Sequence, residues 1–348
     1  MRFHTHLLPT YFPDVDPPFG AYLRRVIEQV TLAEELGWEC QWFTEHHFLP
    51  YGGPIPNPAV MLSAVAARTS RIRLGSAISI LPLHHPIQIA EDYAMVDALS
   101  GGRLEFGIGR GNTELDYKIY GVDREESPAR LREAIEIIRT AWGQEQFSYQ
   151  GQFWQVEDCT LTPRPEQAQT GGPPIWVAGL SGQSMRWAGQ QGFNIMTVSH
   201  PMPPERVNAS VAAWREGLRQ GGHDPATHYN KLHFRVYVHA NRERAREVAE
   251  EALIRYENLQ EARHFRGGPE ITRDTYDFEG MLAQGRNIYG NPDDCIRLIE
   301  VARRHFDFDI CSTTFNFGGI PYPDVLESMR LFAKEVMPGV DALARSGG

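Results

Sequence analysis

Short apolar runs alternate eight times with segments of helical periodicity along the chain, and this alternation restricts the fold more than any other feature. Strands that alternate with helical patterns are typical of βαβ units and a parallel sheet. The expected strands are residues 3–12, 38–44, 72–81, 103–109, 173–179, 193–199, 231–240 and 307–315. The expected helices are residues 21–37, 57–70, 85–102, 127–142, 181–192, 203–222, 242–260, 291–306 and 321–338.

The expected helix ends carry recognisable residues. Gly37 follows the first helical pattern, as a glycine does at a left-handed helix C-terminus. Asn57 and Pro58 form an N-cap with a first-turn proline, and Ser127 with Pro128 repeats that start. These signals support the division into units.

Eight strand–helix units predict a (β/α)₈ TIM barrel that spans residues 1–348 as one domain, with no linker between halves. The 348 residues exceed the usual length of about 250. We assign the excess to a hairpin insertion near 145–165 and to a long, polar, irregular loop near 260–290. The alternative is a doubly wound open sheet, which predicts a glycine fingerprint directly after the first strand; none is there.

Composition excludes several classes of protein. The net charge of −10, with no long basic run, disfavours binding to nucleic acid or to an anionic membrane. The four cysteines are far apart and form no CxxC pair, as expected of a reducing compartment. The N-terminus lacks the apolar core of a signal peptide, and no apolar stretch approaches the ~20 residues of a transmembrane helix. We therefore expect a cytoplasmic protein.

The expected strand ends concentrate polar, glycine and aromatic residues, and "EHHF" at 45–48 is the densest example. In a TIM barrel, chemistry takes place at the C-terminal ends of the strands. Glu45, His46 and His47 could instead be polar residues of a loop that only bond to backbone. The repetition of such residues at most of the strand ends favours a site.

Several motifs together resemble the bacterial luciferase-like flavin-dependent monooxygenases, and within them the luciferase α chain. The resemblance runs almost end to end. It is carried by "EHHF" at 45–48, "NP" at 57–58, "LPLHHPIQIAEDYAMVDALSGGRLEFGIGRG" at 81–111, "YG" at 120–121, "GGPPIWVA" at 171–178 and "SMRLFAKEVMP" at 328–338.

The resemblance implies a two-component monooxygenase with a (β/α)₈ barrel. FMN would arrive as FMNH₂ from a separate NAD(P)H:flavin reductase, and O₂ would be the co-substrate. A small organic substrate would be oxygenated through a C4a-peroxyflavin. The resemblance also implies a homodimer. Three alternatives remain. They are a deazaflavin-dependent oxidoreductase that transfers hydride, a light-emitting enzyme that would need an aldehyde and, as in the luciferases, a partner β chain, and a non-catalytic flavin-binding protein of the same fold.

The resemblance assigns catalytic roles to His46 and Asp116. In the luciferase-like pattern the first His of "EHH" lies by the flavin and acts in acid–base catalysis, and imidazole has an unperturbed pKa in the neutral range. Glu45 and His47 would be its supporting shell, with Glu45 beside the cofactor. Asp116 aligns with a carboxylate that influences flavin chemistry; it could equally cap the helix near Ser127 or lie in solvent.

The resemblance places the FMN phosphate at Arg110 and at the turn that follows the strand at 173–179. A guanidinium suits a phosphate, and a helix N-terminus is an anion site. The luciferase α chain has a reactive cysteine where this chain has Gly109, so a thiol is not expected in the mechanism. The family's glutamate in the turn is missing here. The implied contacts are Ala178, Gly179, Leu180, Ser181 and Ser184.

Three further expectations concern the rest of the site. In the luciferases a non-prolyl cis peptide lies in the stretch that aligns with Ala77 and Ile78, against the flavin ring. No metal is expected, because the histidine pairs 4–6 and 84–85 have no third ligand at metal-ligand spacing. Aromatic residues near strand ends predict an apolar substrate, although aromatics also fill cores. These are Phe12, Phe43, Phe48, Phe315 and Phe317.

Overall fold

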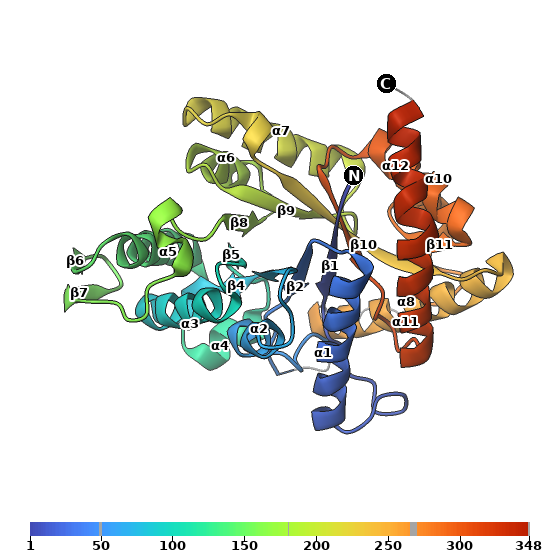
Figure 1. Cartoon of the computed structure of the whole chain (residues 1–348), viewed down its shortest axis with the longest axis horizontal. Coiled ribbons are helices and arrows are strands. Elements are labelled where there is room, and N and C mark those ends of the chain that lie inside the picture. The colour runs from blue at the N-terminus through green and yellow to red at the C-terminus, as the bar shows by residue number, and fades with distance from the viewer. Residues whose placement is uncertain (49–50, 180, 265–269, 347–348) are drawn as a thin grey trace.

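The computed structural model describes residues 1–48, 51–179, 181–264 and 270–346, and these form a closed parallel barrel surrounded by helices (Figure 1). Consecutive barrel strands pair in chain order, and β9 pairs with β10 while β12 pairs with β1, which closes the ring. This confirms the predicted (β/α)₈ fold. The barrel strands are β1 (Arg2–Leu7), β2 (Cys40–Phe43), β3 (Arg73–Ser76), β5 (Leu104–Gly109), β8 (Ile175–Ala178), β9 (Asn194–Val198), β10 (Asn230–Val238) and β12 (Ile310–Thr314).

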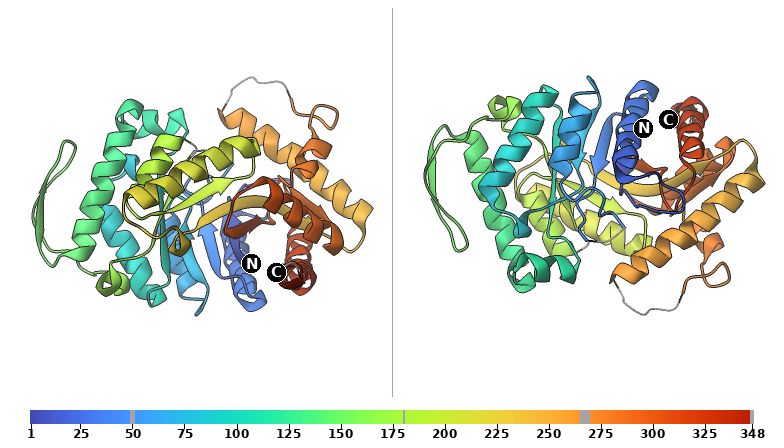
Figure 2. Two further views of the ribbon diagram at one scale, coloured as in Figure 1. Left: turned by 90° about the horizontal axis from the view of Figure 1, so that it is seen from above. Right: turned by 90° about the horizontal axis from the view of Figure 1, so that it is seen from below.

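Helices cover the outside of the barrel, as the views from above and below show (Figure 2). They are α1 (Phe19–Leu36), α2 (Pro58–Ala66), α3 (Pro86–Ser100), α4 (Glu114–Tyr120), α5 (Ser127–Gly143), α6 (Gly182–Gln190), α7 (Pro204–Gln220), α8 (Arg242–His264), α9 (Phe278–Ala283), α10 (Pro292–His305), α11 (Tyr322–Leu331) and α12 (Met337–Ser346). A π-helical segment, Phe332–Val336, joins the last two. Across the described ranges, no helix is long and apolar enough to span a bilayer.

Two of the three predicted helix ends agree with the structure. The third does not: Ser127 is the first residue of α5 itself, and the N-cap is Glu126, without a side-chain cap hydrogen bond. α1 stops at Gly37, whose φ of 95° is in the left-handed region that glycine tolerates. The side chain of Asn57 accepts a hydrogen bond from the Val60 amide at the start of α2, and Pro58 occupies the first turn.

The predicted hairpin is present outside α5 (Figures 1 and 2). It consists of β6 (Phe147–Gln150) and β7 (Gln155–Cys159), which pair antiparallel with Gln150 opposite Gln155. The second expected insertion is only partly right. Residues 260–290 are not an irregular loop throughout, because they contain the end of α8, the short helix α9 and the whole of β11 (Ile288–Gly290), which pairs with β10.

Two expected strands are interrupted. β1 ends at Leu7, and the proline at position 9 has no amide hydrogen to continue a ladder. The expected strand 72–81 divides into β3 and the short β4 (Ser79–Ile80), with a bend between them. Both interruptions occur where the chain leaves the barrel on the side of the strand C-termini.

The core has three parts. The largest lies between the barrel and the helices, and a second fills the barrel lumen with Trp42, Trp176 and Met196. A third, small cluster joins Ile80, Leu83 and Tyr117. Gly107 on β5 leaves room for this lumen packing. A Cβ at that position would lie 1.8 Å from the Ser76 carbonyl oxygen and 2.3 Å from Cε of Met196.

Candidate active site

The "EHHF" segment follows β2 directly, at the C-terminal end of the barrel. The side chains of Glu45 and His47, two residues apart, contact each other, whereas the ring of His46 lies beside Tyr51. His46 is partly buried, and its ring centroid lies 5.8 Å from that of Tyr51. Gly52 packs against the same imidazole, because a Cβ there would lie 2.3 Å from Cδ2 of His46.

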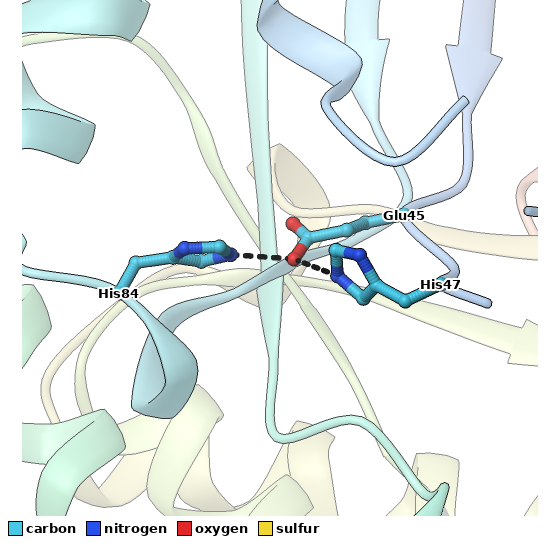
Figure 3. Close-up of side chains that lie close together, drawn as sticks. All are labelled: Glu45, His47 and His84. Carbon is cyan, nitrogen blue, oxygen red and sulfur yellow. Dashed lines mark hydrogen bonds and ion pairs between the residues drawn. The ribbon is translucent and has the colours of Figure 1, made fainter. Parts of the chain in front are cut away.

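Glu45 organises the other side of the segment (Figure 3). Its Oε1 accepts hydrogen bonds from Nε2 of His47 at 3.1 Å and from Nε2 of His84 at 2.6 Å. Its Oε2 accepts from the Ile80 amide at 3.0 Å. Nδ1 of His47 lies 3.4 Å from the Tyr120 hydroxyl. This Glu45–His47–His84 network therefore fixes the chain on both sides of His46.

The charges of the network are complementary. Burial alone raises the pKa of Glu45, but the hydrogen bonds from His47 and His84 and from the Ile80 amide lower it by more, so the carboxyl stays ionised. Burial lowers the pKa of His84, yet the hydrogen bond and charge of Glu45 raise it above its usual value. A protonated imidazole paired with a carboxylate is the expected state at mildly acidic pH.

The network corrects one argument made from the sequence. The metal reading was set aside because no third ligand accompanied the histidine pair, but Glu45 supplies one. The donor atoms of Glu45, His47 and His84 all lie within 4.8 Å of one another. Those atoms already hydrogen-bond to each other, and both imidazoles direct Nε2 at one carboxylate oxygen. A metal ion would have to displace the His84 proton and break these bonds.

A second cluster lies between β5 and α6 and encloses a cavity of about 70 Å³. Arg110, Ala178, Gly179, Ser181 and Ser184 line it. All five are among the residues predicted to contact phosphate, and they come from two separate strand ends. Leu180, predicted with them, lies outside the described residues.

The N-terminus of α6 opens into this cavity. The hydroxyl of Ser181 accepts a hydrogen bond from the Ser184 amide at 3.2 Å and lies 2.9 Å from the Ser184 hydroxyl, as the predicted N-cap requires. Free amides at a helix start and a nearby guanidinium form a donor set that suits a phosphate. A Cβ at Gly179 would lie 2.6 Å from Cε of Met185, so this turn packs closely.

The sequence reasoning missed Arg132, which lines the same cavity from α5. Its guanidinium lies 5.7 Å from the centroid of the Trp187 ring, another lining residue. The sequence offered one indication of this. Arg132 follows Pro128 by one helical turn, so both lie on the same face of α5, and Pro128 also lines the cavity. Two guanidinium groups, Arg110 and Arg132, therefore face the cavity from different elements.

The barrel lumen contains an apolar cluster next to the cavity. The peptide bond between Ala77 and Ile78 is cis, as the resemblance implied. Both residues pack on the lumen cluster of Trp42, Trp176 and Met196. Ala178 packs on this cluster and also lines the cavity, so the two regions are continuous.

Asp116 lies in the first turn of α4, a helix that the sequence analysis did not predict. It is buried and therefore not in solvent. It does not cap α5 either, because the N-cap of that helix is Glu126 and no side chain caps it. The neighbouring Tyr117 donates a hydrogen bond to the Arg110 carbonyl, which links α4 to the strand end that carries Arg110.

Three of the five aromatic residues near strand ends belong to the core outside the barrel, so they are no evidence for an apolar substrate. They are Phe43, Phe315 and Phe317, and Phe315 packs edge-on against Trp38 and Phe332. Aromatic residues near strand ends are often core residues, and the one-dimensional pattern does not separate the two cases.

A buried ion pair was also missed. Arg235 of β10 pairs with Glu257 of α8, and its guanidinium lies 4.4 Å from the Tyr256 ring. The Tyr256 hydroxyl donates to the Tyr51 hydroxyl at 3.2 Å, so this pair connects to the surroundings of His46. Lys231, His233 and Arg235 share one face of β10 by their spacing of two, which was a readable signal.

Comparisons with known proteins agree with this geometry. The family model described as luciferase-like monooxygenase matches residues 1–304. The alkanal monooxygenase α chain of Photorhabdus laumondii is 26% identical over 99% of this chain and 99% of that protein. The oxygenase component of the flavin-dependent trigonelline monooxygenase of Acinetobacter baylyi is 34% identical over 52% of this chain and 50% of that protein.

A solved structure is similar over nearly the whole length. The monooxygenase RslO1 from Streptomyces bottropensis has 28% sequence identity and a TM-score of 0.89, with 97% of this chain and 99% of that chain covered. The family model covers every barrel strand except β12, together with the "EHHF" segment and the cavity at α6. The chain belongs to the luciferase-like monooxygenase family and is an enzyme of the monooxygenase class.

Proposed function

We propose that the protein is the oxygenase component of a two-component FMN-dependent monooxygenase. The observation that carries this proposal is the cavity with two guanidinium groups and the α6 N-terminus, which is joined through Ala178 to the apolar cluster of the lumen. A phosphate and an aromatic ring system on one ligand match these two regions. The donor set therefore fits FMN.

Arg110, Arg132 and the first turn of α6 would hold the phosphate. Charge-assisted hydrogen bonds from guanidinium and amide groups supply both affinity and orientation. Ala77, Ile78 and the lumen cluster would hold the ring in surroundings that exclude water. Reduced FMN, when bound, supplies the chemistry that activates O₂ and inserts one oxygen atom into an organic substrate.

His46 would give and take protons at the reacting edge. An imidazole is suited to this because its unperturbed pKa is near neutral. Its backbone is fixed on both sides by the bonds of Glu45 and His47, so the ring needs little reorganisation. Asp116, buried on α4, would act on the same region electrostatically.

The partners follow from the same proposal. A separate NAD(P)H:flavin reductase would supply FMNH₂. The trigonelline relative is the oxygenase component of its system, which supports this arrangement. The substrate would be a small organic molecule. A second copy of the chain would cover the exposed apolar residues of α2 and α3, which contact each other along the barrel.

The test is a comparison of dissociation constants for FMN, FMNH₂ and a deazaflavin, followed by turnover with a flavin reductase, NADH and O₂. Tight binding of FMNH₂ with oxygen-dependent consumption of a substrate supports the proposal. Tight binding of the deazaflavin alone would assign hydride transfer instead, and FMN binding without turnover on any substrate would indicate a flavin-binding protein.

A further inference from the structure

Lys231 places a cationic side chain inside the barrel lumen. It is the second residue of β10, is 1% exposed, and shares the inward face with His233 and Arg235. Its Nζ lies 3.0 Å from Nδ1 of His6, near the C-terminal end of β1, and 4.6 Å from the centroid of the Trp42 ring. The side chain therefore extends along the lumen toward the end of the barrel that carries the site.

This cation has no acidic counterpart. Among the residues that the structure describes, no carboxylate lies within 4.0 Å of Nζ of Lys231. Glu105, a buried carboxylate of the lumen, pairs with Arg73 and accepts a hydrogen bond from Trp176 Nε1. Burial of an unpaired charge costs several kcal/mol. A buried ammonium without a carboxylate partner is therefore a candidate for binding an anionic group of a ligand.

Of the titratable groups that the structure describes around Lys231, none other than Lys231 itself would carry a positive charge beside a bound anion. They are His4 and His6 of β1, Cys40 of β2 and His233 of β10. Burial lowers the pKa of all three histidines well below the usual value, so they are neutral at pH 7. Burial also lowers the pKa of Lys231, to about 7. An anion beside Nζ would favour the protonated form.

The position of Lys231 connects it to the cofactor region. Ala178 lines the cavity at the α6 N-terminus and also packs on the lumen cluster, to which Trp42 belongs. The Lys231 ammonium lies over the Trp42 ring. A ligand anchored by phosphate at α6 and extended across the cluster would therefore direct its far end toward Lys231.

We propose that Lys231 is a cofactor-binding residue that stabilises the anionic form of reduced FMN. This rests on the proposed function. Reduced flavin loses a proton from N1, and the negative charge is then shared with the C2 oxygen at the pyrimidine end, opposite the dimethylbenzene ring. A positive charge near N1 is one of the few means by which a protein tunes flavin electronics. Oxidised FMN has no such charge, so Lys231 discriminates between the two oxidation states.

The first experiment compares Lys231→Met with wild type. The anaerobic dissociation constants of FMN and FMNH₂ are measured for each, together with the midpoint potential of the bound flavin. Methionine keeps much of the volume without the charge, so the fold is retained. The ratio of FMNH₂ affinity to FMN affinity is expected to fall about tenfold or more, which lowers the two-electron potential by about 30 mV.

Two further variants control this comparison. Lys334→Met removes a lysine whose side chain is 79% exposed on the π-helical segment and should leave the ratio unchanged. Lys231→Arg retains a cation and should recover most of the ratio. An unchanged ratio in Lys231→Met, or the same loss in Lys334→Met, would overturn the proposal.

A measurement on the wild-type protein does not depend on any variant. The absorbance of bound FMNH₂ is recorded against pH, and the N1 proton should be lost at a lower pH than in free FMNH₂. Loss at the same or a higher pH contradicts the role of Lys231. Failure of FMNH₂ to bind wild type at all would instead refute the proposed function, so the two failures are distinguishable.

Discussion

At the scale of single residues, the adjacent histidines His46 and His47 have different surroundings. His47 belongs to the Glu45–His47–His84 network, whereas the ring of His46 packs beside Tyr51. The network holds the chain on either side of His46, which is the residue that we propose for proton transfer.

The variant His46→Ala should fold and bind FMN almost as wild type does, because its ring contributes no bond to the network. Oxygenation of substrate should fall by about 100-fold or more, the usual scale for loss of an acid–base group. Product formed per FMNH₂ supplied is the measurement. His305→Ala, an exposed histidine at the end of α10, is the matched control. Unchanged product yield in His46→Ala would remove His46 from the mechanism.

The cavity at the α6 N-terminus, if it holds the FMN phosphate, predicts that substitutions in it weaken FMN binding more than riboflavin binding. Arg110→Ala, Arg132→Ala and Ser184→Ala should each weaken FMN binding far more than riboflavin binding, because riboflavin has no phosphate. Loss of a hydrogen bond to a charged group costs about 1.5–3 kcal/mol, so roughly a tenfold to 100-fold weaker FMN affinity is expected for each arginine. Fluorescence titration with both ligands measures it. Equal losses for FMN and riboflavin would place these residues elsewhere in the site.

The network also predicts a pH dependence of stability. The folded-state pKa of His84 is raised, so its contribution is complete below the unfolded value of 6.5 and disappears as pH rises through the folded pKa. The folded-state pKa of Glu45 is lowered, so its contribution is present above 4.5 and disappears as pH falls through the folded pKa. His84→Gln should therefore lose the most stability, relative to wild type, between pH 4.5 and 6.5.

Denaturant unfolding at several pH values measures this difference. His305→Gln removes an exposed histidine without a network and should show a small, nearly constant difference. A loss in His84→Gln that stays constant up to pH 9 would mean that the charge of His84 does not contribute.

At the scale of elements, the eight strands were predictable because each is bounded by turn residues and a helical pattern. The short elements were not. α4 has only seven residues, and β11 has three, so neither presents a full period of apolar residues. The ends of strands were misplaced where a residue such as the proline at position 9 interrupts the ladder.

The same limit applies to the site. "EHHF", Arg110 and the turn at α6 could be found because they follow strands in the sequence. The sequence could not assign three other residues to the site, because each contacts residues from other elements and only the closed barrel brings them together. These are His84, Arg132 and Lys231. Charged residues spaced by two on an otherwise apolar strand were the one local signal for Lys231.

Glycine in β5 gives an element-scale prediction. Gly107→Ala should lower the unfolding free energy by about 1–3 kcal/mol or more, because the new methyl group would overlap the Ser76 carbonyl oxygen and Met196. Gly143→Ala at the end of α5 is the control, since a Cβ there meets nothing within 4 Å. Urea unfolding measures both. Equal stability of the two variants would show that the lumen accommodates extra volume.

At the scale of the whole molecule, the exposed apolar residues are grouped in part on α2 and α3. Val60 is 68% exposed, and Met95 and Leu99 are 50% and 57% exposed. If a second copy covers this surface, Leu99→Glu should convert a dimer into a monomer, because it buries a charge in an apolar interface. Sedimentation measures the mass. Phe19→Glu on α1, similarly exposed at 53%, should remain dimeric. A wild-type monomer at micromolar concentration would refute the homodimer.

The choice of cofactor chemistry is also a property of the whole barrel. Oxygen chemistry on a reduced flavin requires a lumen that excludes water, and the cluster of Trp42, Trp176 and Met196 fills the barrel interior beneath the site. When enzyme with bound FMNH₂ is mixed with O₂ in a stopped-flow instrument, we expect an absorbing intermediate that outlives the oxidation of free FMNH₂. A deazaflavin has carbon in place of N5 and does not react readily with O₂. Therefore, if bound FMNH₂ reoxidises as fast as free FMNH₂, while a reduced deazaflavin binds tightly and passes hydride to an acceptor, the barrel supports hydride transfer and the monooxygenase proposal is wrong.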